Sequence, residues 1–228
     1  QQPPESLAAI ILTASGGPFR DRDLSSFDKI TVQQAVNHPN WEMGAKISVD
    51  SATMMNKVFE LIEAKNIFKL SLQNLKILVH RDSYLHAIVK FKNGITKMII
   101  HDTDMKIPIF GTLNFNEKYF KKLNDLDLKK INNLNLHLPN TNKFPLIKIL
   151  KKLPKKFSLF ETVLVATNDK LVDLFLKKKI HYKQISKIFF HVINDKVFSK
   201  YKLITPKKIS DIIKVKKFVQ MKIETRYI

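Results

Sequence analysis

The sequence predicts an α+β fold, in which a mixed sheet flanked by helices and carrying a flexible flap precedes an α-helical C-terminal domain. Two observations support this. Short apolar runs bounded by turn residues, which are typical of strands, occur in the first half of the chain. From Pro145 onward, apolar residues recur at helical spacing instead. We expect a first domain over residues 1–112, a linker over 113–144 and a helical domain over 145–228.

The expected strands lie at residues 9–13, 75–80 and 87–100. The first is a buried apolar run that enters a Gly-Gly-Pro turn. The last consists of two alternating runs joined by Asn93-Gly94, a strong signal for a hairpin. These segments should form one sheet.

The clearest helix is expected over residues 48–68, with Ser51 or Asp50 as its N-cap. One side of this helix is apolar and comprises Met54, Met55, Val58, Phe59, Leu61 and Ile62. A short helix is expected at 31–36, inside a polar and otherwise irregular segment over 20–46. Long irregular segments in compact domains are often functional lids.

The C-terminal part favours a small helical bundle. Its periodic stretches are residues 146–153, 168–180, 183–194 and 207–220. Residues 111–145 are rich in Asn, Lys and Leu, which indicates a connecting segment.

Composition limits the function classes. The chain has 228 residues, a formal net charge of +20 and no cysteine, which excludes disulfides, thiolate metal sites and a cysteine nucleophile. No apolar stretch reaches the ~18 residues of a membrane span. The lysines alternate with Ile, Leu and Phe at helical spacing, so solvated helix faces are favoured over a nucleic-acid site. A basic nucleic-acid-binding protein stays an alternative.

Two loop motifs could bind a ligand. Ser15-Gly16-Gly17-Pro18 follows a strand and could admit an anion to the backbone, although an ordinary turn is the commoner reading. The segment 38–44 holds His38 and the single tryptophan, Trp41. An aromatic residue there could close over a ligand or anchor the loop in the core, and the residues alone favour neither.

A third motif lies on the expected 48–68 helix. Ser51 could hold a phosphate near the helix start, Lys57 could add charge, and Glu60 could bind a hard metal ion. Spacing alone favours a solvated face with a Lys57–Glu60 pair. His80, His86 and the segment His101-Asp102-Thr103-Asp104 could suggest another metal site, but structural histidines are the favoured reading.

Taken in order, these motifs resemble the 1-deoxy-D-xylulose 5-phosphate reductoisomerase family. The matching segments are SGGPFR (15–20), HPNWEMG (38–44), KISVDSATMMNK (46–57), VHRDSYLHAIVKF (79–91) and the stretch 123–149. KISVDSATMMNK is long and specific. The resemblance implies an enzyme that isomerises 1-deoxy-D-xylulose 5-phosphate and reduces the product with NADPH to 2-C-methyl-D-erythritol 4-phosphate, in the non-mevalonate isoprenoid pathway.

The resemblance also implies residue roles. The substrate phosphate would be bound by Ser15, Ser51, Asn56 and Lys57. The residues at the reacting part of the substrate would be His38, Trp41 and Glu60.

The remaining positions concern cofactors and partners. Met43, Gly44 and Met105 would lie near NADPH, and Glu60 would be one carboxylate ligand of a Mg²⁺, Mn²⁺ or Co²⁺ ion. A homodimer is implied, located in the cytoplasm of a bacterium or in a plastid.

The sequence departs from the family in three respects. It has no Rossmann-like Gly-rich turn, and the family's other two metal-binding carboxylates have no counterpart. We therefore expect a partial chain without the NADPH-binding domain, with a catalytically inactive sugar-phosphate-binding remnant as the alternative. The family also has Glu where this chain has Asp169, which places a hydrogen bond between the helical and catalytic domains in question.

Overall fold

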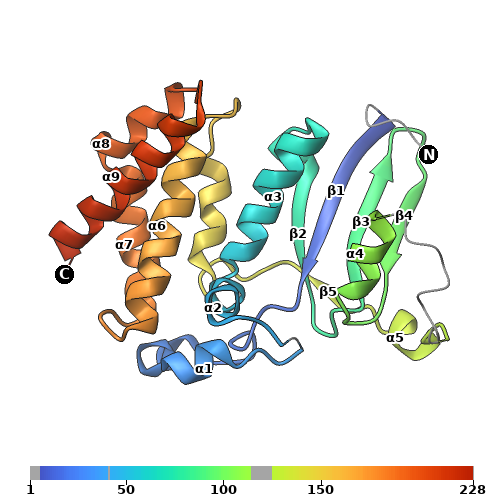
Figure 1. The fold of residues 1–228 in the computed structure, drawn as a ribbon. Coiled ribbons are helices and arrows are strands. Elements are labelled where there is room, and N and C mark those ends of the chain that lie inside the picture. Colours follow the sequence, from blue (N-terminus) through green and yellow to red (C-terminus); the bar gives the residue numbers. More distant parts are fainter. Residues whose placement is uncertain (1–5, 41, 114–124, 228) are drawn as a thin grey trace.

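A computed structural model describes residues 6–40, 42–113 and 125–227. Its mixed sheet has the strand order β4-β3-β1-β2-β5 (Figure 1). β1 and β2 are parallel, and the other neighbouring pairs are antiparallel. The strands are β1 (Leu7–Ala14), β2 (Leu75–His80), β3 (Leu85–Phe91), β4 (Thr96–Ile100) and β5 (Leu136–His137). The expected α+β class and the predicted strands are confirmed.

Helices divide into those near the sheet and those of the C-terminal part. The first group is α1 (Val32–Val36), α2 (Ala45–Thr53), α3 (Met55–Phe68), α4 (Lys106–Thr112) and α5 (Leu128–Asn132), with the 3-10 helices η2 (Leu24–Lys29) and η3 (Leu72–Asn74). The second group is α6 (Leu159–Leu176), α7 (Tyr182–Asn194), α8 (Lys196–Ser199) and α9 (Ile209–Tyr227), with η5 (Pro145–Lys152) and η6 (Lys200–Leu203). The helical C-terminal part is confirmed, although its first stretch is 3-10 rather than α.

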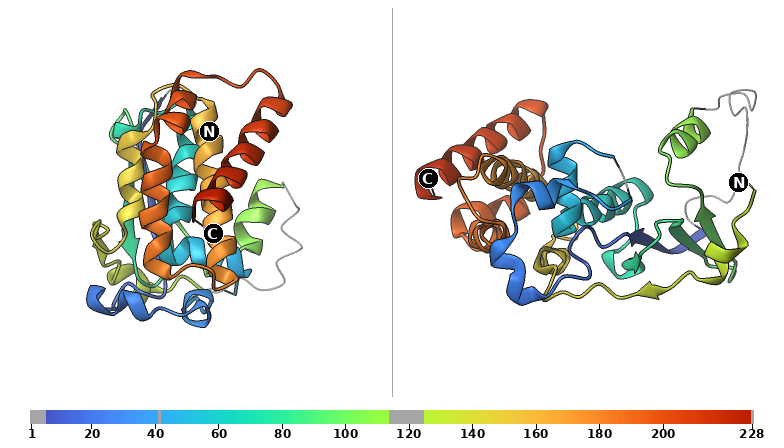
Figure 2. Two further views of the ribbon diagram at one scale, coloured as in Figure 1. Left: turned by 90° about the vertical axis from the view of Figure 1, so that its left-hand side faces the viewer. Right: turned by 90° about the horizontal axis from the view of Figure 1, so that it is seen from below.

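α3 stands between the sheet and the C-terminal helices (Figures 1 and 2). Its two sides enter different hydrophobic clusters. Leu61 packs with Ile10 and Ile77 of the sheet, whereas Val58 belongs to the larger cluster formed with the C-terminal helices. The position of α3 is therefore fixed from both sides.

The expected single helix over 48–68 is wrong, because the chain breaks at Met54, which has φ 60°. Thr53 Oγ1 accepts a hydrogen bond from the Met55 N–H, and the Met54 N–H donates to Ser51 O, so the break leaves these amides satisfied. Met54 packs with the sheet and Met55 with the helices.

The predicted N-cap is also wrong. Gly44 is the N-cap of α2, while Asp50 and Ser51 are buried in its last turns. Ser51 is therefore near the start of α3 rather than at the start of its own helix.

The segment expected to connect the two domains contributes to the sheet. Within 111–145, β5 pairs with β2 through Val79–His137 and His80–Leu136. Residues 114–124 of this segment lie outside the described residues. The boundaries predicted for the three segments stay a prediction.

Polar contacts join α2 and α3 to α6. Lys65 Nζ lies 3.3 Å from Glu161 Oε1, and both side chains are buried. Asn168 Nδ2 donates to Asp50 Oδ1 over 2.7 Å. Asp169 also contributes, because its Oδ1 lies 3.2 Å from Lys46 Nζ. The shorter Asp169 side chain therefore retains a contact between the two parts.

The C-terminal lysines lie mainly on solvated helix faces. In α9, Val215 and Val219 are buried while Lys214, Lys216 and Lys217 are exposed. Among the described helices, none combines the length and apolar character needed to cross a bilayer.

Candidate functional site

The sheet brings several polar residues to one edge. β1 and β2 are parallel, so both end there, and the antiparallel arrangement makes β3 begin and β4 end at the same edge. Ser15 follows β1, Ser83 precedes β3, and His101 follows β4. The ends of parallel strands are a common place for ligand sites.

A cavity of about 460 Å³ lies at this edge. Its lining includes the predicted residues Ser15, His38, Met43, Ser51, Asn56, Lys57, Glu60 and Met105. The turn after β1, the segment before α2 and the start of α3 therefore converge on one cavity. Its size falls within the usual range of small-molecule sites, about 300–1,000 Å³.

Gly17 allows the turn after β1 to approach α2 closely. Its φ is +64°, and a Cβ placed on it would lie 2.6 Å from Ser51 O. A side chain at this position would displace one of the two segments. Gly17 thus holds the Ser15 turn against the part of α2 that carries Ser51.

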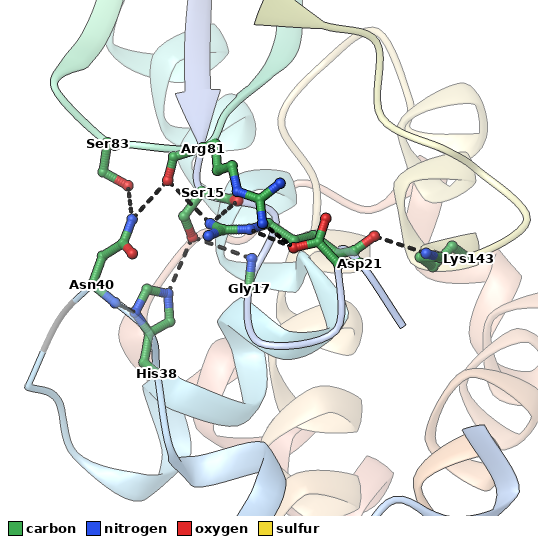
Figure 3. A network of polar contacts seen from close by, with 9 residues as sticks. Ser15, Gly17, Asp21, His38, Asn40, Arg81, Ser83 and Lys143 are labelled. Atoms are coloured by element: carbon green, nitrogen blue, oxygen red, sulfur yellow. Dashed lines mark hydrogen bonds and ion pairs between the residues drawn. The ribbon is translucent and has the colours of Figure 1, made fainter. Parts of the chain in front are cut away.

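Ser15 and His38 form a directed hydrogen-bond network (Figure 3). The Asn40 N–H donates to His38 Nδ1 over 3.1 Å, so neutral His38 carries its proton on Nε2. That nitrogen lies 3.1 Å from Ser15 Oγ, which also accepts from the Gly17 N–H over 3.2 Å. Both contacts donate to Ser15 Oγ, and its own proton can therefore be offered to an anionic ligand.

Neighbouring contacts fix this network to the sheet (Figure 3). Asn40 Nδ2 donates to Arg81 O over 2.8 Å and to Ser83 Oγ over 2.9 Å. Arg20 Nη1 donates to Ser15 O over 2.9 Å. Burial, followed by the positive charge of Arg20, lowers the pKa of His38 from 6.5 to about 4. His38 is therefore neutral near pH 7.

The first turn of α3 faces the cavity through Asn56 and Lys57. Unbonded backbone N–H groups and the helix dipole favour an anion at such a helix start. Lys57 Nζ lies 2.6 Å from Glu60 Oε2, so the pair expected from the spacing is present. The pair borders the cavity, and its Lys57 side chain is only 16% exposed.

Two histidines that the sequence suggested only as a weak metal site, His86 and His101, also line this cavity. The rings of His86 and His101 are stacked, with centroids 3.5 Å apart and planes 6° apart. His86 Nε2 lies 2.9 Å from His101 O. Burial, with smaller effects from the charges of His101 and Lys57, lowers the pKa of His86 to about 4. Their positions, just after the start of β3 and just after β4, could have revealed them once strand pairing was known.

The other residues predicted for the site do not all line the cavity. Met43 and Met105 line the cavity, whereas Gly44 is the N-cap of α2 and is not among the lining residues. Trp41 lies outside the described residues. Part of the segment expected to act as a flexible flap is anchored, because Phe27 and Ala35 are buried in the core. Its flexibility stays a prediction.

The cavity offers few ligands for a divalent metal ion. Two carboxylates, Glu42 and Glu60, line the cavity. Over residues 6–40, 42–113 and 125–227, no three His, Cys, Asp or Glu side chains are grouped as a metal site would require. Mg²⁺ prefers about six oxygen ligands. The described residues therefore do not form a metal site by themselves.

Two family models match the chain. The "1-deoxy-D-xylulose 5-phosphate reductoisomerase C-terminal domain" matches residues 1–68, and the "DXP reductoisomerase C-terminal domain" matches residues 100–222. Among curated proteins, the 1-deoxy-D-xylulose 5-phosphate reductoisomerase of Pelagibacter ubique is 50% identical over 216 residues. That alignment covers 95% of this chain and 56% of the relative. The corresponding protein of Chloroherpeton thalassium is 44% identical, with 81% of this chain and 48% of the relative covered.

Solved structures agree with these matches. The reductoisomerase from Zymomonas mobilis in complex with NADPH is 33% identical with a TM-score of 0.79, and the match covers 96% of this chain and 55% of that chain. A DOX-P reductoisomerase in complex with NADPH, fosmidomycin and magnesium is 30% identical with a TM-score of 0.81, covering 97% of this chain and 57% of that chain. The chain spans about half the length of the curated relatives it matches.

Proposed function

Because the chain belongs to the 1-deoxy-D-xylulose 5-phosphate reductoisomerase family, we propose that it takes part in the NADPH-dependent conversion of 1-deoxy-D-xylulose 5-phosphate to 2-C-methyl-D-erythritol 4-phosphate. The observation that carries this proposal is the cavity in which the Ser15 turn, the His38 segment and the start of α3 meet. Its donors suit a phosphorylated sugar.

The phosphate is proposed to lie between Ser15, Ser51, Asn56 and Lys57. Ser15 supplies a hydroxyl donor, because its described contacts occupy its oxygen as an acceptor. Asn56 and Lys57 add donors in the first turn of α3, where the dipole also favours an anion. Phosphate binding at a distance from the reacting carbons would provide positioning energy for the chemistry.

Neutral His38 is proposed to contact the sugar and to orient Ser15. Its lowered pKa supports this role, since a neutral imidazole keeps a defined donor at Nε2 and acceptor at Nδ1. Glu60 borders the same cavity and is proposed to face the reacting end of the substrate, with Trp41 covering it. Met43, Gly44 and Met105 are proposed to lie toward the nicotinamide of NADPH.

The metal ion of the relatives needs more donors than this cavity provides. Glu60 is proposed as one ligand of Mg²⁺, Mn²⁺ or Co²⁺, but Glu42 and Glu60 alone do not complete its shell. This observation favours a second candidate function, in which the chain binds a sugar phosphate without turning it over.

A homodimer is proposed as the assembled form, by analogy with the family. Light scattering on purified chain would give twice the chain mass if this is right. A monomer mass at all concentrations tested would contradict it.

The experiment that separates the two functions has two parts. The chain is titrated calorimetrically with 1-deoxy-D-xylulose 5-phosphate, and NADPH oxidation is then followed at 340 nm in the presence of the substrate and Mn²⁺. Saturable binding with NADPH consumption supports the reductoisomerase. Binding without consumption supports the second candidate, and absence of binding contradicts both.

A further inference from the structure

A second cavity, of about 350 Å³, lies between segments that are far apart in the sequence. Its walls come from η2, the last residue of α2, the residues leading into η5 and the first turns of α7. Thr53 is the α2 residue that lines this cavity, and it lies two residues after Ser51, which lines the first cavity. The two cavities share no lining residue, so this one is separate from the proposed substrate site.

One wall of this cavity is apolar. It is formed by Leu24, Phe27, Pro145, Leu146 and Tyr182. Phe27, Leu146 and Tyr182 are almost fully buried, whereas the Leu24 side chain remains 45% exposed. The Tyr182 hydroxyl donates to Ala52 O over 2.6 Å, so its ring is fixed in place and lacks a free polar end. Such a wall favours a hydrocarbon group over a sugar.

The other wall carries three lysines, namely Lys143, Lys183 and Lys187. Lys143 Nζ donates to Arg20 O over 2.7 Å, which uses one of its three N–H donors. Lys183 Nζ lies 2.6 Å from Asp28 Oδ2. Asp28 is the carboxylate paired with these lysines in the described contacts, so one negative charge faces three positive charges.

Two uncharged polar residues, Asn142 and Ser186, lie beside these lysines. The side-chain amide of Asn142 can donate to an anion. The Ser186 hydroxyl already donates to Lys183 O over 3.2 Å, so the lysines and Asn142 are the donors that this wall offers. Lysine is a common partner of phosphate and carboxylate groups, and hydrogen bonds between charged partners are stronger than those between neutral groups.

We propose that this cavity binds a small amphipathic anion, with a hydrocarbon body against the Leu24–Tyr182 wall and a phosphate or carboxylate on the three lysines. The volume suits a small molecule rather than a folded partner. The combination of an apolar wall and a cationic wall that Asp28 compensates only in part selects for this chemistry. A purely polar anion would leave the exposed surface of Leu24 in water, and a cation would be repelled.

The test uses octyl phosphate below its micelle-forming concentration, titrated calorimetrically into the full chain. Octyl trimethylammonium and inorganic phosphate are the control ligands. We expect one saturable site for octyl phosphate, with at least tenfold weaker binding of either control. Equal binding of inorganic phosphate would overturn the apolar part of the proposal, and equal binding of the ammonium compound would overturn the anionic part. Octanoate then distinguishes the two anionic head groups.

Variants locate the site. Ser186→Trp fills the cavity without removing a lysine, and Lys183→Gln with Lys187→Gln removes two cations without filling it. Each should weaken octyl phosphate at least tenfold, while Lys148→Gln, at an exposed position outside the cavity, should not. Thermal unfolding checks that each variant folds; if the tryptophan variant does not, the double glutamine variant decides.

Wild-type affinity in the folded variants would overturn the proposal. Ser15→Ala separates it from the proposed function, because that change should weaken sugar-phosphate binding and leave octyl phosphate binding unchanged. Loss of octyl phosphate binding in Ser15→Ala would place the ligand in the first cavity and contradict the proposal.

Discussion

His38 Nε2 lies 3.1 Å from Ser15 Oγ, although the two residues are 23 positions apart in the chain. The contact joins the turn after β1 to the segment that precedes α2. Because His38 and the Gly17 N–H both donate to Ser15, the serine proton is available to a ligand. This relationship underlies the first prediction.

Ser15→Ala should weaken binding of 1-deoxy-D-xylulose 5-phosphate roughly tenfold, because one hydrogen bond of about 1–1.5 kcal/mol is lost. Calorimetric titration measures the change. Ser25→Ala, at an exposed position of η2, is the matched control and should leave the affinity unchanged. Equal affinities of Ser15→Ala and wild type would show that Ser15 does not contact the ligand.

Stability should rise with pH between about 4 and 6.5. The pKa of His38 falls from 6.5 to about 4 in the folded protein, so in this range the unfolded chain binds more protons at His38. The stabilising contribution of His38 is therefore fully present above pH 6.5 and is lost as the pH falls toward 4. His38→Gln should show a smaller rise in the free energy of unfolding over this range, measured by urea denaturation at several pH values. An unchanged rise would contradict the assignment.

Gly17→Ala should destabilise the protein by about 1–3 kcal/mol, because the new Cβ would lie 2.6 Å from Ser51 O at a backbone φ of +64°. Urea denaturation gives the free energy of unfolding. Gly111→Ala is the control, since no atom lies within 4 Å of its added Cβ and Gly111 is inside α4. Alanine favours helix there and should be neutral or stabilising. Similar effects of both substitutions would refute the close approach.

Glu161→Gln should lower the free energy of unfolding by about 3–5 kcal/mol, because it leaves the buried Lys65 ammonium without its carboxylate. Asp173→Asn is the comparison, because Asp173 forms an exposed i,i+4 pair with Lys177. Such exposed pairs contribute about 0–1 kcal/mol. If both variants unfold at the same denaturant concentration, the Lys65–Glu161 contact does not tie α3 to α6.

The sheet was largely predictable from sequence, whereas the break at Met54 was not. Apolar runs and the Asn93-Gly94 turn specify β1 to β4 through local patterns. Met54 adopts φ 60° between α2 and α3, and methionine has no local preference for this left-handed conformation that would signal the break. β5 was missed because its two residues form a strand only through pairing with β2.

The site residues also divide into those that could be predicted from sequence and those that depend on long-range contacts. The family resemblance of the motifs, rather than their spacing alone, pointed to residues such as Ser15 and Lys57, which the fold brings to one cavity. Ser83, His86 and His101 were not selected, because their position at the cavity depends on the pairing of β3 and β4. Strand pairing is a long-range property, and the sequence around each histidine contains no local record of it.

A phosphate site at the start of α3 is tested by calorimetric titration of wild type, Lys57→Ala and the exposed control Lys92→Ala with 1-deoxy-D-xylulose 5-phosphate and with 1-deoxy-D-xylulose. We expect Lys57→Ala to weaken binding of the phosphorylated sugar about 10- to 100-fold, because a charged hydrogen bond is lost. Lys57→Ala should leave the affinity for the unphosphorylated sugar nearly unchanged. Lys92→Ala should leave the affinity for both sugars unchanged. Equal losses for both sugars, or none for either, would contradict a phosphate site at the start of α3.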